Sequence, residues 1–135
     1  MENSEKLISA VFDFGRVMRE RIGSVNFSHN LSHGQIQTLK FIESNKGRTM
    51  KEISSFLRVR PPTATTMINS LVKSGEIKRV DDEGDRRITK LELTKKGEKI
   101  LKESFGTVAK ELKSIFSKLN DKDIENLINI LEKIK

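Results

Sequence analysis

The sequence predicts a mainly α-helical protein with one small β-hairpin in its middle. Two observations lead to this prediction. Apolar residues recur at the three- and four-residue spacing of amphipathic helices over most of the chain. Only the stretch after Gly75 alternates with a period of two, on both sides of an acidic turn at 81–85, as hairpin strands do. We therefore expect helices at both ends and a mixed segment between them.

Composition limits the class of protein. The 135 residues fit a single domain whose core needs no disulfide or metal, and the chain has no cysteine. Thiol catalysis, thiolate metal sites and cysteine-based oxidant sensing are therefore excluded. The N-terminus is acidic where a signal peptide would be basic, and no apolar run approaches the roughly 20 residues of a membrane span. We expect a cytoplasmic protein with no membrane partner.

Positive charge is concentrated in the middle of the chain. The formal net charge is +7, and residues 46–99 hold 14 Lys and Arg against 8 Asp and Glu. The two ends together are nearly neutral. A localised positive field favours a phosphate-binding surface, although a lysine-rich face is often merely solvated.

The N-terminal segment has an apolar stripe at helical spacing that ends near Gly23. The C-terminal segment has a heptad-like seam, and the pair Asn120 and Asp121, good N-cap types, then opens another helix. These long apolar faces favour a homodimer, and the alternative that they fold back on the middle of the chain stays open. The residues of the three stripes are Leu7, Ile8, Val11, Phe12, Gly15, Met18 and Ile22, then Leu101, Phe105, Val108, Leu112, Ile115 and Leu119, then Ile124, Leu127, Ile128, Leu131 and Ile134.

Two capping boxes introduce short helices in the middle of the chain. Ser32 to Gln35 has the Ser-x-x-Gln form, and Thr49 to Glu52 has the Thr-x-x-Glu form. In the second helix, Ile53, Phe56 and Leu57 are expected to face inward. The Arg60-Pro61-Pro62 run requires an extended Arg60 and then allows a third helix to begin. This rhythm is typical of a helix-turn-helix.

The third helix has one apolar face, and its opposite face is unusual. Ala64, Ile68 and Leu71 mark the side that packs, whereas Thr66 and Asn69 lie on the opposite side. An ordinary solvated helix usually carries Glu and Lys there. Short hydroxyl and amide side chains suit a helix whose backbone must approach another surface closely, such as the floor of a DNA major groove.

The hairpin after this helix is expected to form a wing. Ile77 and Arg79 lie before the turn, Ile88 to Leu93 lie after it, and Arg86 and Arg87 stand just past the tip. A hairpin appended to a helix-turn-helix gives a winged helix-turn-helix, flanked here by the two helical ends.

At this point the sequence resembles the multiple-antibiotic-resistance regulator (MarR) family of winged-helix transcription factors. The matching motifs occur in the family's order and spacing across about half of the chain. They are Leu31 to Gln35, Ile53 to Leu57 before Val59, Thr63 to Thr65, Leu71 to Ile77, Asp85-Arg86-Arg87 and Leu93 to Gly97.

The resemblance implies an organisation and a function. It implies one domain over 1–135, with dimerisation helices at about 1–23 and 98–135 and a winged helix-turn-helix at about 31–97. It also implies a sequence-specific regulator that binds a roughly palindromic operator in double-stranded DNA as a homodimer. We expect a repressor, with relief by a small ligand as one option, and no enzymatic activity. The alternative is a winged-helix module that binds RNA or another protein.

Specific residues follow from the same resemblance. The wing arginine matching Arg87 enters the minor groove, and the aspartate matching Asp85 orients it. On a strand, residues i and i+2 share a side, so the carboxylate is expected to bind the guanidinium. The expected DNA contacts are Thr49, Arg58, Arg60, Pro62, Thr63, Thr65, Thr66, Asn69, Lys73, Asp85, Arg86 and Arg87.

One departure from the family affects the expected operator. Many members carry an arginine where this chain has Thr66, and the third helix contains no arginine at all. We therefore expect thymine methyl contacts from threonine and an adenine contact from Asn69, hence an A·T-rich operator.

Effector and metal sites are less visible in the sequence. The family commonly responds to small aromatic or phenolic anions, so a small aromatic effector is among the implied partners. Its pocket residues stay open, because the candidate aromatic and Met side chains are also ordinary core types. His29 and His33 straddle a helix start and lack further ligands, so neither a metal nor a cofactor is expected. The candidates for the effector pocket are Phe12, Phe14, Met18, Phe27 and Phe41.

Overall fold

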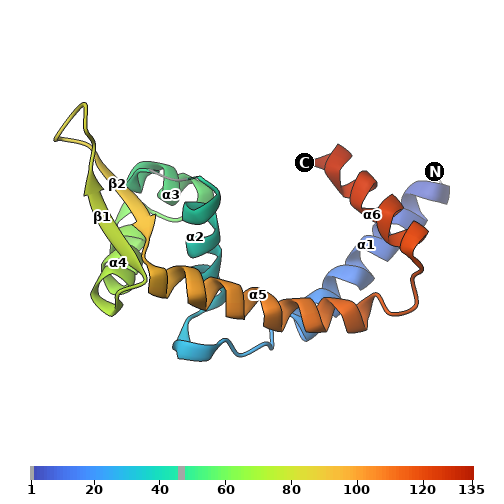
Figure 1. The fold of residues 1–135 in the computed structure, drawn as a ribbon. Helices are drawn as coiled ribbons and strands as arrows, with labels where there is room; N and C mark the ends of the chain where they lie inside the picture. The colour runs from blue at the N-terminus through green and yellow to red at the C-terminus, as the bar shows by residue number, and fades with distance from the viewer. Residues whose placement is uncertain (1, 46–47) are drawn as a thin grey trace. The chain divides into compact units, whose positions relative to one another are not determined.

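The computed structural model describes residues 2–45 and 48–135. Within these residues, seven helical segments and two strands follow one another, and Figure 1 shows the longer ones. Mainly helical structure with one hairpin confirms the predicted fold class. The elements are α1 (Glu2–Arg21), the 3₁₀ turn η1 (Ser28–Asn30), α2 (His33–Ser44), α3 (Met50–Leu57), α4 (Pro61–Ser74), β1 (Ile77–Asp81), β2 (Thr89–Leu93), α5 (Lys95–Ile115) and α6 (Asp121–Ile134).

The chain forms two compact units. One consists of residues 1–25 and 106–135, and the other is the central segment 26–105. α5 belongs to both units, because the boundary falls inside it. The expectation of a single domain over 1–135 stays a prediction.

The unit formed by the two ends leaves its apolar side chains uncovered. Among the described residues of α1 and α6, none is buried. Phe14 pairs with Phe116, with ring centroids 6.0 Å apart, and Arg21 binds Glu111 with 3.0 Å between Nη2 and Oε2. Most of the predicted stripe nevertheless stays exposed: Leu7, Ile8, Val11 and Phe12 on α1, and Ile128, Leu131 and Ile134 on α6.

The central unit has a continuous apolar core. Every one of its elements from α2 to the first turns of α5 contributes to that core, which is why this segment forms a stable scaffold. Figure 1 shows α2, α3 and α4 beside the base of the hairpin, whose tip stands clear of them. The core residues are Ile36, Leu39, Ile42, Ile53, Ile68, Leu71, Ile77, Leu91, Ile100 and Leu101.

The predicted helix starts are confirmed. Both capping boxes are present, with the side chain of Ser32 accepting from the Gln35 amide and that of Thr49 accepting from the Glu52 amide. Arg60 is extended, with φ −68° and ψ 148°, and α4 begins at the following proline. Each short helix therefore begins where its own sequence satisfies the free N–H groups of the first turn.

The hairpin pairs β1 and β2 in antiparallel register, with Ile77 opposite Leu93 and Asp81 opposite Thr89. Its connection is longer than the predicted turn at 81–85. The β2 strand begins at Thr89, so Ile88, placed in a strand by the sequence pattern, lies in the connection. Arg48, just before α3, forms a further bridge to Leu91, its carbonyl accepting from the Leu91 amide at 3.0 Å.

A close backbone approach joins α4 and α5. The Thr94 hydroxyl donates to the Gly75 carbonyl at 2.5 Å and accepts from the Gly97 amide at 3.1 Å. A Cβ at Gly97 would lie 2.2 Å from the backbone oxygen of Glu76, so this helix position requires glycine. Gly75 ends α4 with φ 94°, a conformation that also favours glycine. These contacts explain the Thr-x-x-Gly pattern at the start of α5.

One expected core residue is not buried. Phe56 was predicted to face inward with Ile53 and Leu57, but 48% of it is exposed. Its ring stacks on Phe41, with centroids 4.1 Å apart. The ring lies at the edge of the core, where it also lines an open groove with Lys40 and Phe105. None of the described helices is long and apolar enough to cross a membrane.

Candidate nucleic-acid interface

The α4 helix buries one side completely and exposes the other. Ala64, Ile68 and Leu71 have no exposed surface, because they pack into the core of the central unit. The opposite side carries the side chains that the sequence analysis selected. Pro62, Thr63, Thr65, Thr66, Asn69 and Lys73 are all exposed.

The turn between α3 and α4 adds two exposed arginines. Arg58 ends α3 in the left-handed conformation, with φ 55° and ψ 41°, and its amide donates to the carbonyls of Ser54 and Ser55. The Ser54 hydroxyl donates to the Val59 carbonyl at 2.8 Å. The backbone of the turn is thus held from within, while the side chains of Arg58 and Arg60 remain at the surface.

Two side chains on the exposed face of α4 have their hydrogen bonding partly fixed. The Thr66 hydroxyl donates to the Pro62 carbonyl at 3.0 Å, so this oxygen can only accept from a partner while its methyl group stays free. The Asn69 carboxamide oxygen accepts from Nη2 of Arg79, which comes from β1. Arg79 was not among the residues selected from the sequence.

The wing carries the expected aspartate and arginine pair. The Asp85 carboxylate accepts three hydrogen bonds from Arg87: from the backbone amide at 3.0 Å, from Nε at 3.1 Å and from Nη2 at 3.2 Å. The predicted pairing is present, but the strand geometry invoked for it was wrong. Both residues lie in the connection after β1, where the turn, and not alternation along a strand, brings them together.

A second acidic side chain of the wing tip, Asp82, is also held. Asp82 binds Lys90 at 2.8 Å, and its amide donates to the Ile88 carbonyl at 3.1 Å. A hydrogen bond from the Arg87 side chain lowers the pKa of Asp85. A hydrogen bond from Lys90 likewise lowers the pKa of Asp82, and the same bond raises the pKa of Lys90. Asp82 and Asp85 are therefore ionised at neutral pH, and 90% of the Arg87 side chain is exposed.

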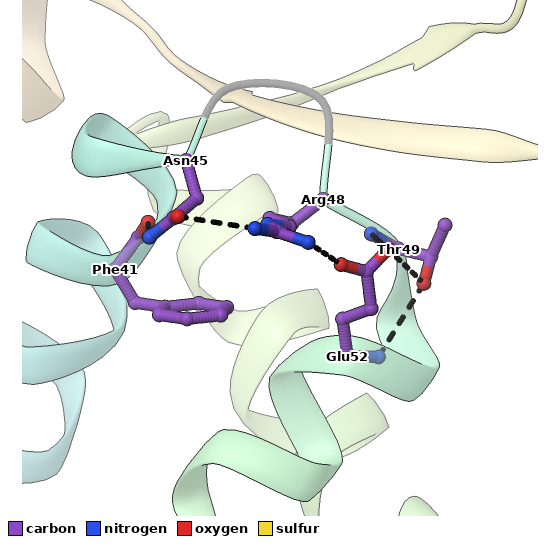
Figure 2. Close-up of polar contacts among 5 residues, drawn as sticks. All are labelled: Phe41, Asn45, Arg48, Thr49 and Glu52. Atoms are coloured by element: carbon purple, nitrogen blue, oxygen red, sulfur yellow. Dashed lines mark hydrogen bonds and ion pairs between the residues drawn. The ribbon is translucent and has the colours of Figure 1, made fainter.

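A cluster around Arg48 ties the wing to the helix-turn-helix. Figure 2 shows its guanidinium between the end of α2 and the start of α3: it donates to Asn45 Oδ1 at 3.1 Å and to Glu52. The bond from Arg48 lowers the pKa of Glu52, with a smaller contribution from Thr49. Because the Arg48 carbonyl also accepts from β2, one residue links two helices and the hairpin.

This cluster bears on Thr49, one of the predicted DNA contacts. Its hydroxyl accepts from the Glu52 amide at 3.4 Å and donates to Glu52 Oε1 at 3.1 Å. Both roles of that hydroxyl are therefore used within the protein, and Thr49 is half-buried. The arrangement favours a helix cap as its main role.

Arg48 and Arg79 are not among the residues predicted from the sequence, and only Arg79 has a sequence pattern that indicates its position. Arg79 lies two residues after Ile77, and alternation along a strand places both on the side that faces α4. That relation indicated a position beside α4. Arg48 lies before a capping box with no periodic pattern around it, so nothing in the sequence indicated its bridge to β2.

The histidines and the aromatic candidates each have separate neighbours. His29 Nε2 lies 3.6 Å from Glu103, and the His33 ring packs edge-on against Phe27. Within residues 2–45 and 48–135, no three His, Cys, Asp or Glu side chains are grouped so that they would hold a metal ion. Phe41 stacks on Phe56, and Phe56 lines a groove. The other residues that line this groove are Ile36, Gln37, Lys40, Leu57 and Phe105.

Together, the exposed face of α4, the basic turn before it and the hairpin after it define a winged helix-turn-helix protein. Residues 29–88 match the model of the MarR family. The chain is 24% identical over 134 residues to an uncharacterized HTH-type transcriptional regulator, YpoP of Bacillus subtilis (strain 168). The alignment covers 99% of this chain and 92% of YpoP.

Solved structures agree with this match. Streptococcus pneumoniae FabT, in a complex with DNA, aligns with a TM-score of 0.65 and 26% identity over 99% of each chain. The multiple antibiotic-resistance repressor from Listeria monocytogenes aligns with a TM-score of 0.71 over 98% of this chain and 93% of that one, and its 22% identity shows the shared fold alone. Over residues 29–88 the chain is therefore similar to the MarR family of transcriptional regulators.

Proposed function

We propose that this protein binds a roughly palindromic, A·T-rich operator in double-stranded DNA as a homodimer and represses transcription. The carrying observation is the contrast across α4. Its inner side chains are fully buried, whereas every residue selected for base contact on its outer side is exposed. A helix that is rigidly held from behind and presents short polar side chains suits the major groove.

The wing supplies a second contact in this proposal. Arg87 is almost fully exposed but oriented by Asp85, so it can enter a minor groove without first being ordered. A narrow A·T-rich minor groove concentrates negative potential, which attracts an arginine. Arg58 and Arg60, at the turn before α4, are placed at the surface for phosphate contacts.

The exposed apolar side chains of α1 and α6 support the homodimer. Phe12 is 68% exposed and Ile134 is 75% exposed, and they belong to stripes that recur at helical spacing. Contiguous apolar surface of this kind marks an interaction site on a protein that is otherwise highly charged. A second copy of the same chain offers an identical stripe, which favours a symmetric pair.

A small aromatic effector stays part of the proposal. The groove beside the stacked pair Phe41 and Phe56 is lined mainly by apolar side chains and contains the ammonium of Lys40, 5.0 Å from the Phe105 ring centroid. These groups suit an aromatic anion.

The test is selection of bound duplexes from a random DNA library by the purified protein at near-physiological salt, which suppresses binding driven by counterion release alone. We expect an enriched inverted repeat that is rich in A·T pairs. Binding without an enriched repeat would contradict the proposal and would leave RNA or another protein as the partner of the winged helix.

A further inference from the structure

The contact between Arg79 and Asn69 joins the wing to the centre of the exposed face of α4. Asn69 is exposed on α4, and Arg79 is exposed on β1, which packs against that helix. A guanidinium has only donors, so the carboxamide atom that faces Arg79 must be the oxygen of Asn69. The orientation of this amide is thereby fixed by chemistry.

This orientation changes what Asn69 can offer to a base. An asparagine reads adenine with two bonds: its oxygen accepts from N6 and its nitrogen donates to N7. Here Arg79 already donates to that oxygen. The Asn69 nitrogen keeps its two N–H groups, and the guanidinium beside it adds further donors. The Asn69 oxygen keeps one lone pair, but a base donor that approaches it would meet the guanidinium N–H groups, so the pair presents mainly donors.

Guanine matches such a surface. Its major-groove edge carries two acceptors, N7 and O6, whereas adenine places an N6 donor next to its N7 acceptor. We propose that Arg79 is a specificity-determining residue that converts Asn69 from an adenine reader into a guanine reader at one position of each half-site. This inference rests on the proposed function, and it replaces the adenine contact expected for Asn69.

The neighbouring side chains define the limits of this effect. The Thr66 hydroxyl is fixed as an acceptor with a free methyl group, so it suits an A·T pair, whose thymine methyl contacts the threonine. Lys78, adjacent to Arg79 on β1, is directed to the other side of the strand and lies 3.9 Å from Glu92. One G·C pair within an otherwise A·T-rich half-site is therefore the expected pattern.

The experiment measures relative affinities of the full-length protein for duplexes in which each position of the selected half-site is changed to every other base. Asn69→Ala identifies the base pair that Asn69 contacts, because the base preference is expected to disappear only at that position. At that position the unmodified protein is expected to prefer guanine over adenine by roughly 5- to 150-fold, the range for one good bidentate contact. In Arg79→Met the Asn69 oxygen is released, and the preference moves toward adenine.

Lys78→Met is the matched control. It removes the same charge from the neighbouring residue, so it should weaken binding to all duplexes alike while the guanine preference stays. A melting curve for each variant establishes that it is folded. If Arg79→Met does not fold, the preference of the unmodified protein at the position located by Asn69→Ala still decides the matter.

The outcomes separate the inference from the proposed function. A preference for adenine at that position in the unmodified protein, or a guanine preference that survives in folded Arg79→Met, would overturn the inference alone. Absence of any sequence-specific duplex binding would overturn the proposed function, and the inference with it.

Discussion

Replacing Asp85 by asparagine tests the role of the wing most sharply. The Asp85 carboxylate accepts from Nε and Nη2 of Arg87, and asparagine has the same size but only one acceptor oxygen. At most one of the two guanidinium bonds can therefore survive. The Arg87 side chain, 90% exposed, would otherwise be free to sample many rotamers.

The expected loss comes from ordering that side chain during DNA binding. Immobilising one long, rotamer-rich side chain lowers affinity by roughly two- to twelvefold. A dimer with two wings would suffer this cost twice, so binding to the operator should weaken by roughly 5- to 150-fold. Removing a carboxylate near phosphate acts in the opposite direction, because it reduces electrostatic repulsion.

Glu83→Gln separates the two effects. Glu83 is exposed at the same wing tip and takes no part in the Arg87 bonds, so its replacement removes the same charge and leaves Arg87 oriented. Fluorescence anisotropy with the selected operator and with a scrambled duplex measures both variants. We expect Asp85→Asn to weaken operator binding only, and Glu83→Gln to leave it equal or slightly tighter. Equal operator affinities for the two variants would refute the reasoning.

Three further predictions concern stability. Arg58→Gly removes the strain of a non-glycine residue in the left-handed conformation, so it should stabilise the fold by about 0.5–1 kcal/mol in thermal unfolding. The same substitution removes an exposed positive charge and should weaken operator binding. Gly97→Ala should destabilise the fold by more than about 2 kcal/mol, because its Cβ would meet the Glu76 backbone. Gly106→Ala, with nothing within 4 Å of the added Cβ, should stabilise the fold by up to about 1 kcal/mol. Similar effects of the two substitutions in thermal unfolding would contradict the packing account. The bond to Arg48 lowers the pKa of Glu52, so the unmodified protein should be more stable than Glu52→Gln by the full amount above pH 4.5. This difference in stability should shrink as the pH falls below 4.5 and through the folded-state pKa. A difference that stays constant down to pH 2 in pH-dependent melting would argue against that pair.

Local sequence rules predicted the helix-turn-helix well because its boundaries are set by adjacent residues. The capping boxes at Ser32 and Thr49, and the proline after Arg60, act within one helical turn of themselves. The buried side of α4 followed from spacing alone, since Ala64 and Ile68 lie on a single helical face.

Contacts between distant segments were harder to predict. The pairing of Asp85 with Arg87 came from a resemblance, and its stated geometry was wrong because the strands end before the tip. The exposure of Phe56 depends on how far the core extends beneath α3, which no local pattern records. The bond between Arg79 and Asn69 joins a strand to a helix, so it required the packed structure.

The central claim is that two copies of this chain read one duplex with two-fold symmetry. Analytical ultracentrifugation of the protein with the selected operator, and with the same operator lengthened by five base pairs at its centre, tests it most directly. The insertion turns the half-sites to opposite faces of the duplex, since one turn of DNA takes about 10 base pairs. We predict that two protein chains bind the unmodified operator. The lengthened duplex is expected to bind the protein no more tightly than a duplex with a single half-site does. Equal binding to both duplexes, or one chain per operator, would contradict the account.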